Sequence, residues 1–412
     1  MTTTAPTTMT GKHLRVALTC SGLSHVRRGV EAWSQEAFDG LRARGVDVEL
    51  FKGSGLPAPS AVPGTGQAGA AQAGANGVPG VRVVPCIRRD STFSRQLTSL
   101  LPRGGWRLGI GSPYQAEQTS FAVNAFWAIR HQFDLLHTKD PQVAWLFHRA
   151  HRLGLSRPKV ILNHGTEEPP EFLNRFDFIQ HLAPAHLEEA RLQGVGASHQ
   201  FVVPNFVDTE RFCPGRDDGL RGELGIPADA LVVTSVAAIK RHHKRIDWLL
   251  REMEFLAKEL PELYLVVAGA RTDDTGSLLG MARELLGDRV RFLVDFPRAQ
   301  MPRLYRASDV FVLCSHKEML SNALLEALAT GLPCVASVHP VNRWAVGEGG
   351  QLVETDRPGA VADAVASYRL RAVREAVGVR ARAQALEVFA KDAVLARQIA
   401  MYRTVGEARE QP

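Results

Sequence analysis

Two glutamates, Glu318 and Glu326, stand eight residues apart around the predicted start of a helix. An apolar, strand-like run ends at Ser315, and either Ser321 or Asn322 is a suitable N-cap for the helix that follows. A helix N-terminus at the carboxyl end of a parallel strand is a common anion site. The helix N–H groups can therefore hold phosphate while the carboxylates accept hydrogen bonds from hydroxyl groups. The alternative interpretation is a solvated helix glutamate and a loop charge.

A second candidate site is a basic loop between a strand-like run at 230–239 and a helix predicted to begin near Ile246. Its cations are Lys240, Arg241, Lys244 and Arg245. The loop opens at the carboxyl end of its strand, so we expect the cations to face the same edge of the sheet as the glutamates. Fixed cations there would stabilise negative charge that develops on a leaving phosphate. The alternative is a solvated basic turn, in which His242 and His243 also face solvent.

The elements that position these residues predict an α/β protein. Short apolar runs alternate with helical patterns, and their continuous hydrophobicity favours parallel strands that are buried on both faces. The runs in the first half are 14–20, 46–51, 81–87, 134–138, 159–163 and 200–204. Those in the second half are 230–239, 263–269, 290–294, 310–315 and 333–337. The helix that contains Glu326 is predicted to end at Gly331, just before Pro333.

The pattern breaks at 204–214, which is rich in Pro, Asp and Gly. We therefore expect two facing Rossmann-like, doubly wound domains with a ligand cleft between them. The expected boundaries are a disordered leader at 1–12, a first domain at 13–207, a second domain at 208–389, and a C-terminal helix at 390–412 that crosses back to the first domain. Residues 56–80 are low-complexity Ala, Gly and Pro, which predicts a flexible insertion. Their Gly64-x-Gly66-x-x-Gly69 is interpreted as accidental, because no strand precedes it.

Composition excludes several classes of protein. The 412 residues are 45% hydrophobic and carry a net charge of 49 − 43 = +6. The basic residues are dispersed, so no nucleic-acid partner is expected. No apolar run reaches the ~18 residues of a spanning helix, and the five cysteines lie at least twenty residues apart. These features favour a cytoplasmic protein. No Asp-x-Asp motif offers a diphosphate-bound metal, so neither a metal nor another cofactor is expected.

Three motifs, in this order, resemble one known family. Residues 204–212 read PNFVDTERF, residues 238–247 read AIKRHHKRID, and residues 318–333 read EMLSNALLEALATGLP. Together with two strands that end at His137 and His164, they make the chain similar to the retaining glycosyltransferases of the B fold, in the family numbered four. The resemblance covers roughly residues 14–400.

Three positions depart from the family pattern. Phe206 and Met319 stand where glycine is common, and Ala238 stands where an arginine is usual. Arg241 or Lys240 would have to substitute for that arginine.

The resemblance implies the roles of individual residues. Catalytic roles are implied for His164, Glu318, Lys244 and Arg241. Donor-binding roles are implied for Gly22, Lys240, Met319, Leu320, Ser321, Asn322 and Glu326. His164 would lie beside the reacting sugar carbon, with His137 as the alternative, and each histidine could instead be a buried, hydrogen-bonded residue. Gly22 could be a simple turn residue, and the neighbouring His25, Arg27 and Arg28 either contact an anionic acceptor or face solvent.

The implied activity is metal-independent transfer of a sugar from a nucleotide-sugar donor, with retention at the anomeric carbon. The acceptor stays open between a glycan, a lipid carrier and a small metabolite, and so does the number of subunits. If the acceptor is a lipid, the basic first domain would contact anionic membrane peripherally. The alternatives are a nucleotide-sugar epimerase of similar fold and a non-catalytic partner subunit.

Overall fold

The computed structural model describes residues 14–26, 29–55, 78–100, 105 and 109–408. The predictions for the leader at 1–12, for Arg27 and Arg28, and for most of the insertion at 56–80 therefore concern residues outside the described ranges.

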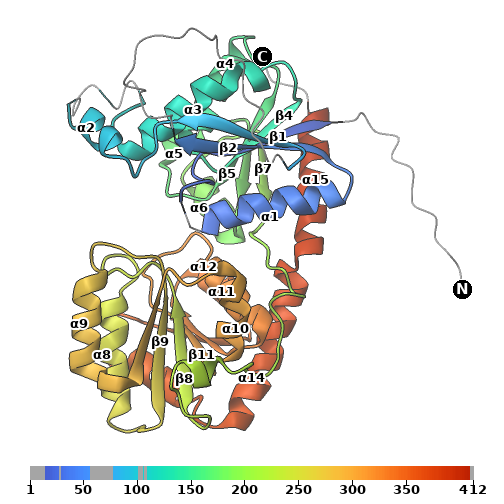
Figure 1. Ribbon diagram of the computed structural model, residues 1–412. Helices are drawn as coiled ribbons and strands as arrows, with labels where there is room; N and C mark the ends of the chain where they lie inside the picture. Colours follow the sequence, from blue (N-terminus) through green and yellow to red (C-terminus); the bar gives the residue numbers. More distant parts are fainter. Residues whose placement is uncertain (1–13, 27–28, 56–77, 101–104, 106–108, 409–412) are drawn as a thin grey trace, which may run out of the picture.

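The first domain is built on a parallel sheet of seven strands within the described residues, in the order β3-β2-β1-β4-β5-β6-β7 (Figure 1). The strands are β1 (Arg15–Cys20), β2 (Asp47–Gly55), β3 (Val81–Cys86), β4 (Leu135–Thr138), β5 (Lys159–His164), β6 (Phe178–His181) and β7 (His199–Val202). The helices are α1 (Gly29–Ala43), α2 (Thr92–Leu100), α3 (Pro113–Ile129), α4 (Pro141–Arg152), α5 (Pro170–Leu173) and α6 (Pro184–Leu192).

The second domain has a parallel sheet of six strands in the described chain, in the order β10-β9-β8-β11-β12-β13. They are β8 (Leu231–Val236), β9 (Leu263–Gly269), β10 (Val290–Val294), β11 (Val310–Leu313), β12 (Cys334–Ser337) and β13 (Gly350–Val353). The helices are α7 (Leu220–Glu223), α8 (Ile246–Ala257), α9 (Thr275–Leu286), α10 (Met301–Arg306), α11 (Asn322–Thr330), α12 (Pro340–Val346), α13 (Ala360–Ala366) and α14 (Arg371–Gln384).

Both sheets are buried on both faces, as their continuous apolar runs predict. In β1, Val16 and Leu18 belong to one hydrophobic cluster, while Ala17 belongs to another on the opposite face. In β8, Val232 and Val233 likewise belong to two different clusters on opposite faces of the sheet. The predicted class, two doubly wound α/β domains, is confirmed. None of the described helices is both long and apolar enough to cross a membrane.

Two strands of the structure were not predicted from the sequence, β6 and β13. Each has four residues, and each contains a glutamine, Gln180 or Gln351, within a short apolar run. Gln180 is buried, and its Nε2 donates to Val203 O at 2.7 Å. A four-residue strand with a polar centre gives too weak a pattern to be distinguished from a loop.

The chain crosses between the domains twice, and the two crossings lie side by side. Val207 N donates to Phe389 O at 2.9 Å, and Lys391 N donates to Val207 O at 3.1 Å. The returning segment is a π-helical turn (Ala385–Phe389), after which α15 (Lys391–Glu407) runs along the first domain (red in Figure 1).

Helix α15 completes the core of the first domain. Its Leu395 and Val405 are fully buried, in the same cluster as Val16 and Leu18 of β1. Lys159 at the start of β5 donates from Nζ to Ala408 O at 2.6 Å, which fixes the far end of the helix. The crossover helix expected from the sequence is thus present.

Candidate active site

Each sheet reverses its strand order once, between β1 and β4 in the first domain and between β8 and β11 in the second. Ligands of open α/β sheets bind at the carboxyl ends of strands at such switch points. The loops that follow these strands carry Gly22, Lys139, Lys244 and Glu318. The two edges meet directly, because Asn322 at the start of α11 donates from Nδ2 to Gly29 O at the start of α1, at 3.0 Å. The N-termini of two helices therefore converge on one cleft.

Lys244 and Glu318 form an ion pair at the switch point of the second domain. Lys244 Nζ donates to Glu318 Oε1, and the side chains are only 19% and 13% exposed. The residues on either side of Lys244, His243 and Arg245, have φ angles of 71° and 53°. This left-handed conformation costs a non-glycine residue about 1 kcal/mol or more, and such strain persists only where surrounding contacts impose it. The strained loop directs Lys244 toward Glu318.

Two other cations of the basic loop, Arg241 and Arg245, contact different elements of the second domain. The described contacts of the Arg241 side chain lie on α8 and α9: its Nη2 donates to Ser277 Oγ at 3.3 Å, and Nη1 is 3.7 Å from Asp247 Oδ2. Arg245 Nη1 donates to Thr355 Oγ1 at 3.0 Å, beyond β13. Lys240 is half-buried in the loop. Of the predicted cations, the structure thus brings Lys244 together with Glu318 and places Arg241 against neighbouring helices.

Helix α11 begins and ends as predicted. Ser321 is the N-cap, with its side chain accepting from Leu324 N at 3.4 Å, and Gly331 adopts φ 80° at the C-terminus. The first N–H groups of a helix have no partner inside it, so they are available to an anion in the cleft. Leu320 is 7% exposed and packs in the core of the second domain, and Met319 packs against the same cluster. The side chain of Leu320 is therefore turned away from the cleft, whereas that of Met319 is only partly buried.

Glu326 turns into the protein rather than toward solvent. The residue is 3% exposed, forms an ion pair with Arg298, and accepts a hydrogen bond from Tyr305 Oη at 3.0 Å. Burial raises the pKa of Glu326, although Arg298 and Tyr305 favour its ionised form. Arg298 also donates from Nη2 to Glu36 Oε1 of α1, at 3.2 Å. The predicted donor-binding glutamate thus belongs to a chain of ionic contacts between the two domains.

In the first domain, Gly22 lies in the turn after β1. A Cβ atom there would stand 2.7 Å from Glu31 Oε1 and 3.0 Å from Arg89 Nη2, so no side chain fits without displacing these groups. Gly22 O accepts from Val26 N at 2.8 Å. A side chain at this position would therefore make the two charged groups that close over the turn move aside.

Behind this turn lies a buried polar network that the sequence analysis missed. Glu117 is fully buried and accepts hydrogen bonds from Ser21 Oγ at 3.1 Å, His25 Nε2 at 2.6 Å, and Arg89 N and Nε at 2.9 Å each. Burial alone would raise the pKa of Glu117, but the bonds from His25 and Arg89 outweigh it and lower the pKa to about 2. The partners lie 28 to 96 residues from Glu117 in sequence, so no local motif reveals them.

A second unpredicted feature joins the first domain to the loop that precedes α11. Lys139, 5% exposed, donates from Nζ to Asn205 Oδ1 at 2.7 Å and stacks 3.9 Å above the ring of Trp33. Asn205 in turn donates from Nδ2 to Leu320 O at 3.3 Å. Burial lowers the pKa of Lys139 to about 7. The Lys139 amine and the Asn205 amide therefore connect three segments: the end of β4, the domain linker and the loop before α11.

The two predicted histidines occupy different surroundings. His137 is fully buried, and its Nδ1 lies 2.7 Å from Tyr402 Oη of α15, so it fastens the crossover helix to β4. His164 lies at the end of β5, with its Nδ1 3.3 Å from His181 Nδ1. Burial lowers the pKa of His164 to about 4, which keeps its imidazole neutral. Lys317, next to Glu318, reaches to 3.5 Å from Glu167 in the loop that follows His164.

Metal-ligating side chains do not gather in the described part of the chain. No group of three or more His, Cys, Asp or Glu there is arranged to hold a metal ion. The expectation that the reaction needs no metal stays a prediction.

The fold and this cleft define a class of two-domain α/β proteins that bind their ligands between facing doubly wound sheets. Residues 230–368 match the family described as glycosyl transferases group 1. A D-inositol 3-phosphate glycosyltransferase of Actinosynnema mirum is 30% identical over 402 residues, which cover 84% of this chain and 94% of that protein. The chain belongs to this glycosyltransferase family.

Solved structures agree in fold. The sucrose-phosphate synthase of Thermosynechococcus elongatus has a TM-score of 0.71 at 18% identity, and the match covers 95% of this chain and 99% of that one. The Anabaena protein HepE in complex with UDP-glucose has a TM-score of 0.68 at 17% identity, covering 96% and 100%. The architecture is the GT-B fold.

Proposed function

We propose that the chain transfers a sugar from a nucleotide-sugar donor, held by the second domain, to an acceptor held by the first, with retention of anomeric configuration. The observation that carries this proposal is the pairing of Lys244 with Glu318 beside the N-terminus of α11, at the switch point of the second sheet. A cation and free helix N–H groups suit a diphosphate, and a carboxylate suits sugar hydroxyls. HepE, a neighbour in fold, is seen with UDP-glucose, which supports a donor of this class.

Each side chain then has a definite role. Lys244 has three N–H donors, so it can hold the Glu318 carboxylate and a diphosphate oxygen together. As the bond to the sugar breaks, charge accumulates on that oxygen, and Lys244 with the N–H groups of α11 stabilises it. His164 is neutral and can hydrogen-bond a sugar hydroxyl at the reacting centre. We infer that the Glu326 carboxylate binds the ribose only when the bound donor displaces Arg298 from that carboxylate.

For retention we propose a front-face route. The leaving phosphate oxygen accepts the acceptor's proton while the acceptor oxygen attacks the same face of the sugar. This route asks the chain only to orient the two substrates and to stabilise the departing diphosphate.

The test uses a panel of UDP- and GDP-sugars without an acceptor. Hydrolysis of each donor is measured as the release of its nucleotide. Slow hydrolysis of one donor supports the proposal and names that donor. Interconversion of the sugar without nucleotide release would instead indicate an epimerase, and neither binding nor turnover of any donor would indicate a non-catalytic subunit. D-inositol 3-phosphate is the first acceptor to test, because the relative from Actinosynnema mirum is named for it. The anomeric configuration of the product, read by NMR, checks retention.

Turnover is expected to survive metal removal. Because Lys244 and helix N–H groups supply the positive charge, dialysis against EDTA should change kcat by less than about twofold. Loss of activity on chelation with recovery on Mg²⁺ or Mn²⁺ would contradict this expectation.

Lys139→Met should raise the KM for the donor by about fivefold to tenfold, the equivalent of one buried hydrogen bond. The methionine keeps the apolar stem on Trp33 but loses the bond to Asn205, so the loop at Leu320 is held less firmly. Asn205→Leu is the matched variant, because it removes the other partner of the Lys139–Asn205 hydrogen bond. An unchanged KM in both variants would mean that the link does not position the donor loop.

Contact with anionic membrane stays a prediction that depends on a lipid acceptor. Sedimentation with anionic vesicles at low and high salt tests it, since surface attraction of this kind is screened by salt. Failure to sediment at low salt would point to an acceptor in solution.

A further inference from the structure

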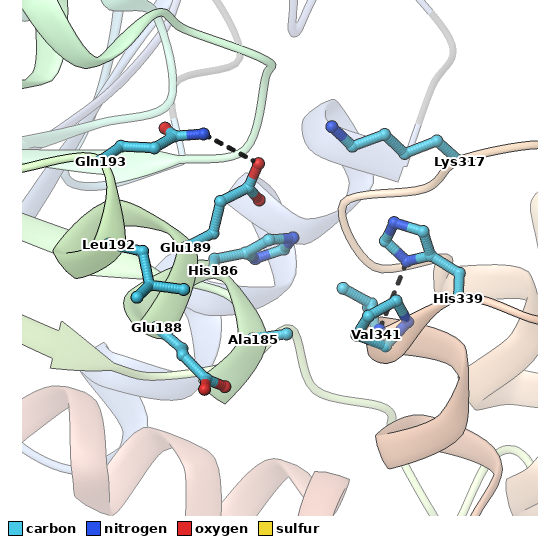
Figure 2. A pocket seen from close by; sticks show the side chains of 10 residues that line it. Ala185, His186, Glu188, Glu189, Leu192, Gln193, Lys317, His339 and Val341 are labelled. Atoms are coloured by element: carbon cyan, nitrogen blue, oxygen red, sulfur yellow. Dashed lines mark hydrogen bonds between the residues drawn. The ribbon is translucent and has the colours of Figure 1, made fainter.

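A pocket of about 470 Å³ lies between the two domains (Figure 2). Its first-domain wall is α6, and its second-domain wall is the start of α12 with Lys317. The side chains that line it are Ala185, His186, Glu188, Glu189, Leu192, Gln193, Lys317, His339, Pro340 and Val341. The ring centroid of His186 is 6.0 Å from that of His164, so the pocket adjoins the proposed reacting centre.

His186 is the unusual member of this lining. The residue is 3% exposed, yet neither ring nitrogen has a hydrogen-bond partner among the described residues. Buried polar atoms are nearly always paired, so an unpaired imidazole on the wall of a cavity indicates a missing partner. Figure 2 shows the ring directed from α6 toward His339 and Lys317 on the opposite wall. A neutral imidazole offers one donor and one acceptor, which matches a ligand hydroxyl group.

The charges of the pocket oppose an anionic ligand. Glu188 and Glu189 stand on α6, and Glu189 accepts a bond from Gln193 Nε2 at 3.3 Å. The cation on the opposite wall, Lys317, is already 3.5 Å from Glu167. Burial, with smaller contributions from His164, His181, His339 and Lys317, lowers the pKa of His186 to about 3, so its ring adds no positive charge.

Apolar side chains complete the lining. Ala185, Leu192, Pro340 and Val341 offer carbon surface next to the amide, imidazoles and carboxylates. A sugar or cyclitol ring presents C–H groups on its faces and hydroxyl groups around its edge. A mixture of carbon surface with groups that donate and accept hydrogen bonds fits such a ring better than it fits a phosphate or a fatty chain.

We propose that this pocket binds a neutral, hydroxyl-rich ring of the acceptor, with His186 hydrogen-bonded to ring hydroxyls. The inference rests on the proposed function, because it places the part of the acceptor that does not react next to His164. It also narrows the acceptor to molecules that carry a sugar or cyclitol ring, whatever else is attached to them.

The test measures binding of maltose and of myo-inositol to the full chain by saturation-transfer NMR. Wild type should bind at least one of them. His186→Leu should weaken that binding about tenfold, because it removes both polar atoms, while His186→Gln, which keeps a donor and an acceptor, should retain most of it. His131→Leu, at an exposed histidine outside the pocket, is the matched control and should bind like wild type.

Thermal unfolding of each variant shows whether it is folded. If His186→Leu does not fold, Leu192→Asp on the exposed rim replaces it and should weaken binding about threefold through loss of carbon surface. Three results would each overturn the inference. They are that wild type binds neither polyol, that the two His186 variants bind equally well, or that inorganic phosphate displaces the polyol. Binding of a polyol by a protein that neither binds nor turns over any nucleotide sugar would instead remove the proposed function and leave the pocket assigned.

Discussion

Lys244→Ala should lower kcat by about 10²–10³-fold, the usual cost of removing one fixed donor from a site of developing charge. The side chain is four-fifths buried and paired to Glu318, so water cannot readily replace it. The same change leaves the Glu318 carboxylate without its described partner at the place proposed for the diphosphate. Repulsion between the carboxylate and the diphosphate then adds to the loss. Single-turnover measurements with the donor identified by the hydrolysis panel separate this effect from changes in binding.

Arg241→Ala is the matched control, because Arg241 lies in the same loop and has the same charge. Its guanidinium contacts α8 and α9 and is 38% exposed, so its removal should change kcat by less than about threefold. If the arginine variant lost as much activity as the lysine variant, the loop would act through its total positive charge rather than through the single amine of Lys244. The role proposed for Lys244 would then be wrong.

Glu117→Leu should lower the free energy of unfolding of the first domain by about 3–5 kcal/mol, the range found when one partner of a buried ion pair is removed. The variant leaves Arg89 and His25, whose side chains are 11% and 3% exposed, without the fully buried carboxylate that both contact. Glu284→Leu, at an exposed position on α9, is the control and should change stability by less than about 0.5 kcal/mol. Urea unfolding followed by tryptophan fluorescence measures both, and an equal response would contradict a structural role for the network.

The contribution of Glu117 should also depend on pH in a defined direction. Its pKa is lowered from an ordinary 4.5 to about 2 in the folded protein, so its stabilising effect is complete above pH 4.5. The effect is lost as the pH falls from 4.5 toward 2. The stability difference between wild type and Glu117→Leu should therefore be constant from neutral pH down to about 5 and shrink below it. A difference that grows on acidification would mean that Glu117 is protonated in the native state.

The sequence could predict features that depend on neighbouring residues along the chain. Helix α11 carries its own start and stop in Ser321 and Gly331, so its bounds follow from neighbouring residues. The direction of Arg241 does not follow in this way. It depends on contacts with residues that lie 33 and 36 positions away: Asp274 Oδ2 accepts from Arg241 N at 3.0 Å, and Ser277 Oγ accepts from Arg241 Nη2 at 3.3 Å.

The remaining features arise from contacts between distant segments. The contact of the Glu326 carboxylate with Arg298, 28 residues away, could not be predicted from the sequence, and the donor-binding role of Glu326 stays a prediction. Likewise, His186, whose ring nitrogens have no partner in the described part of the chain, becomes conspicuous only once the fold places α6 opposite α12. Such features require three-dimensional proximity, which a single sequence does not encode in any short pattern.

The return of α15 to the first domain has a consequence for biosynthesis. The ribosome delivers β1 to β7 first, but the apolar surface that α15 covers around Val16 and Leu18 stays open until the whole second domain has been made. Domain-by-domain folding during translation is therefore interrupted here, since the domain that is translated first is completed last. During that interval the nascent chain exposes apolar surface to which a chaperone can bind, and a ribosome stalled before residue 391 would release a first domain that lacks one wall of its core.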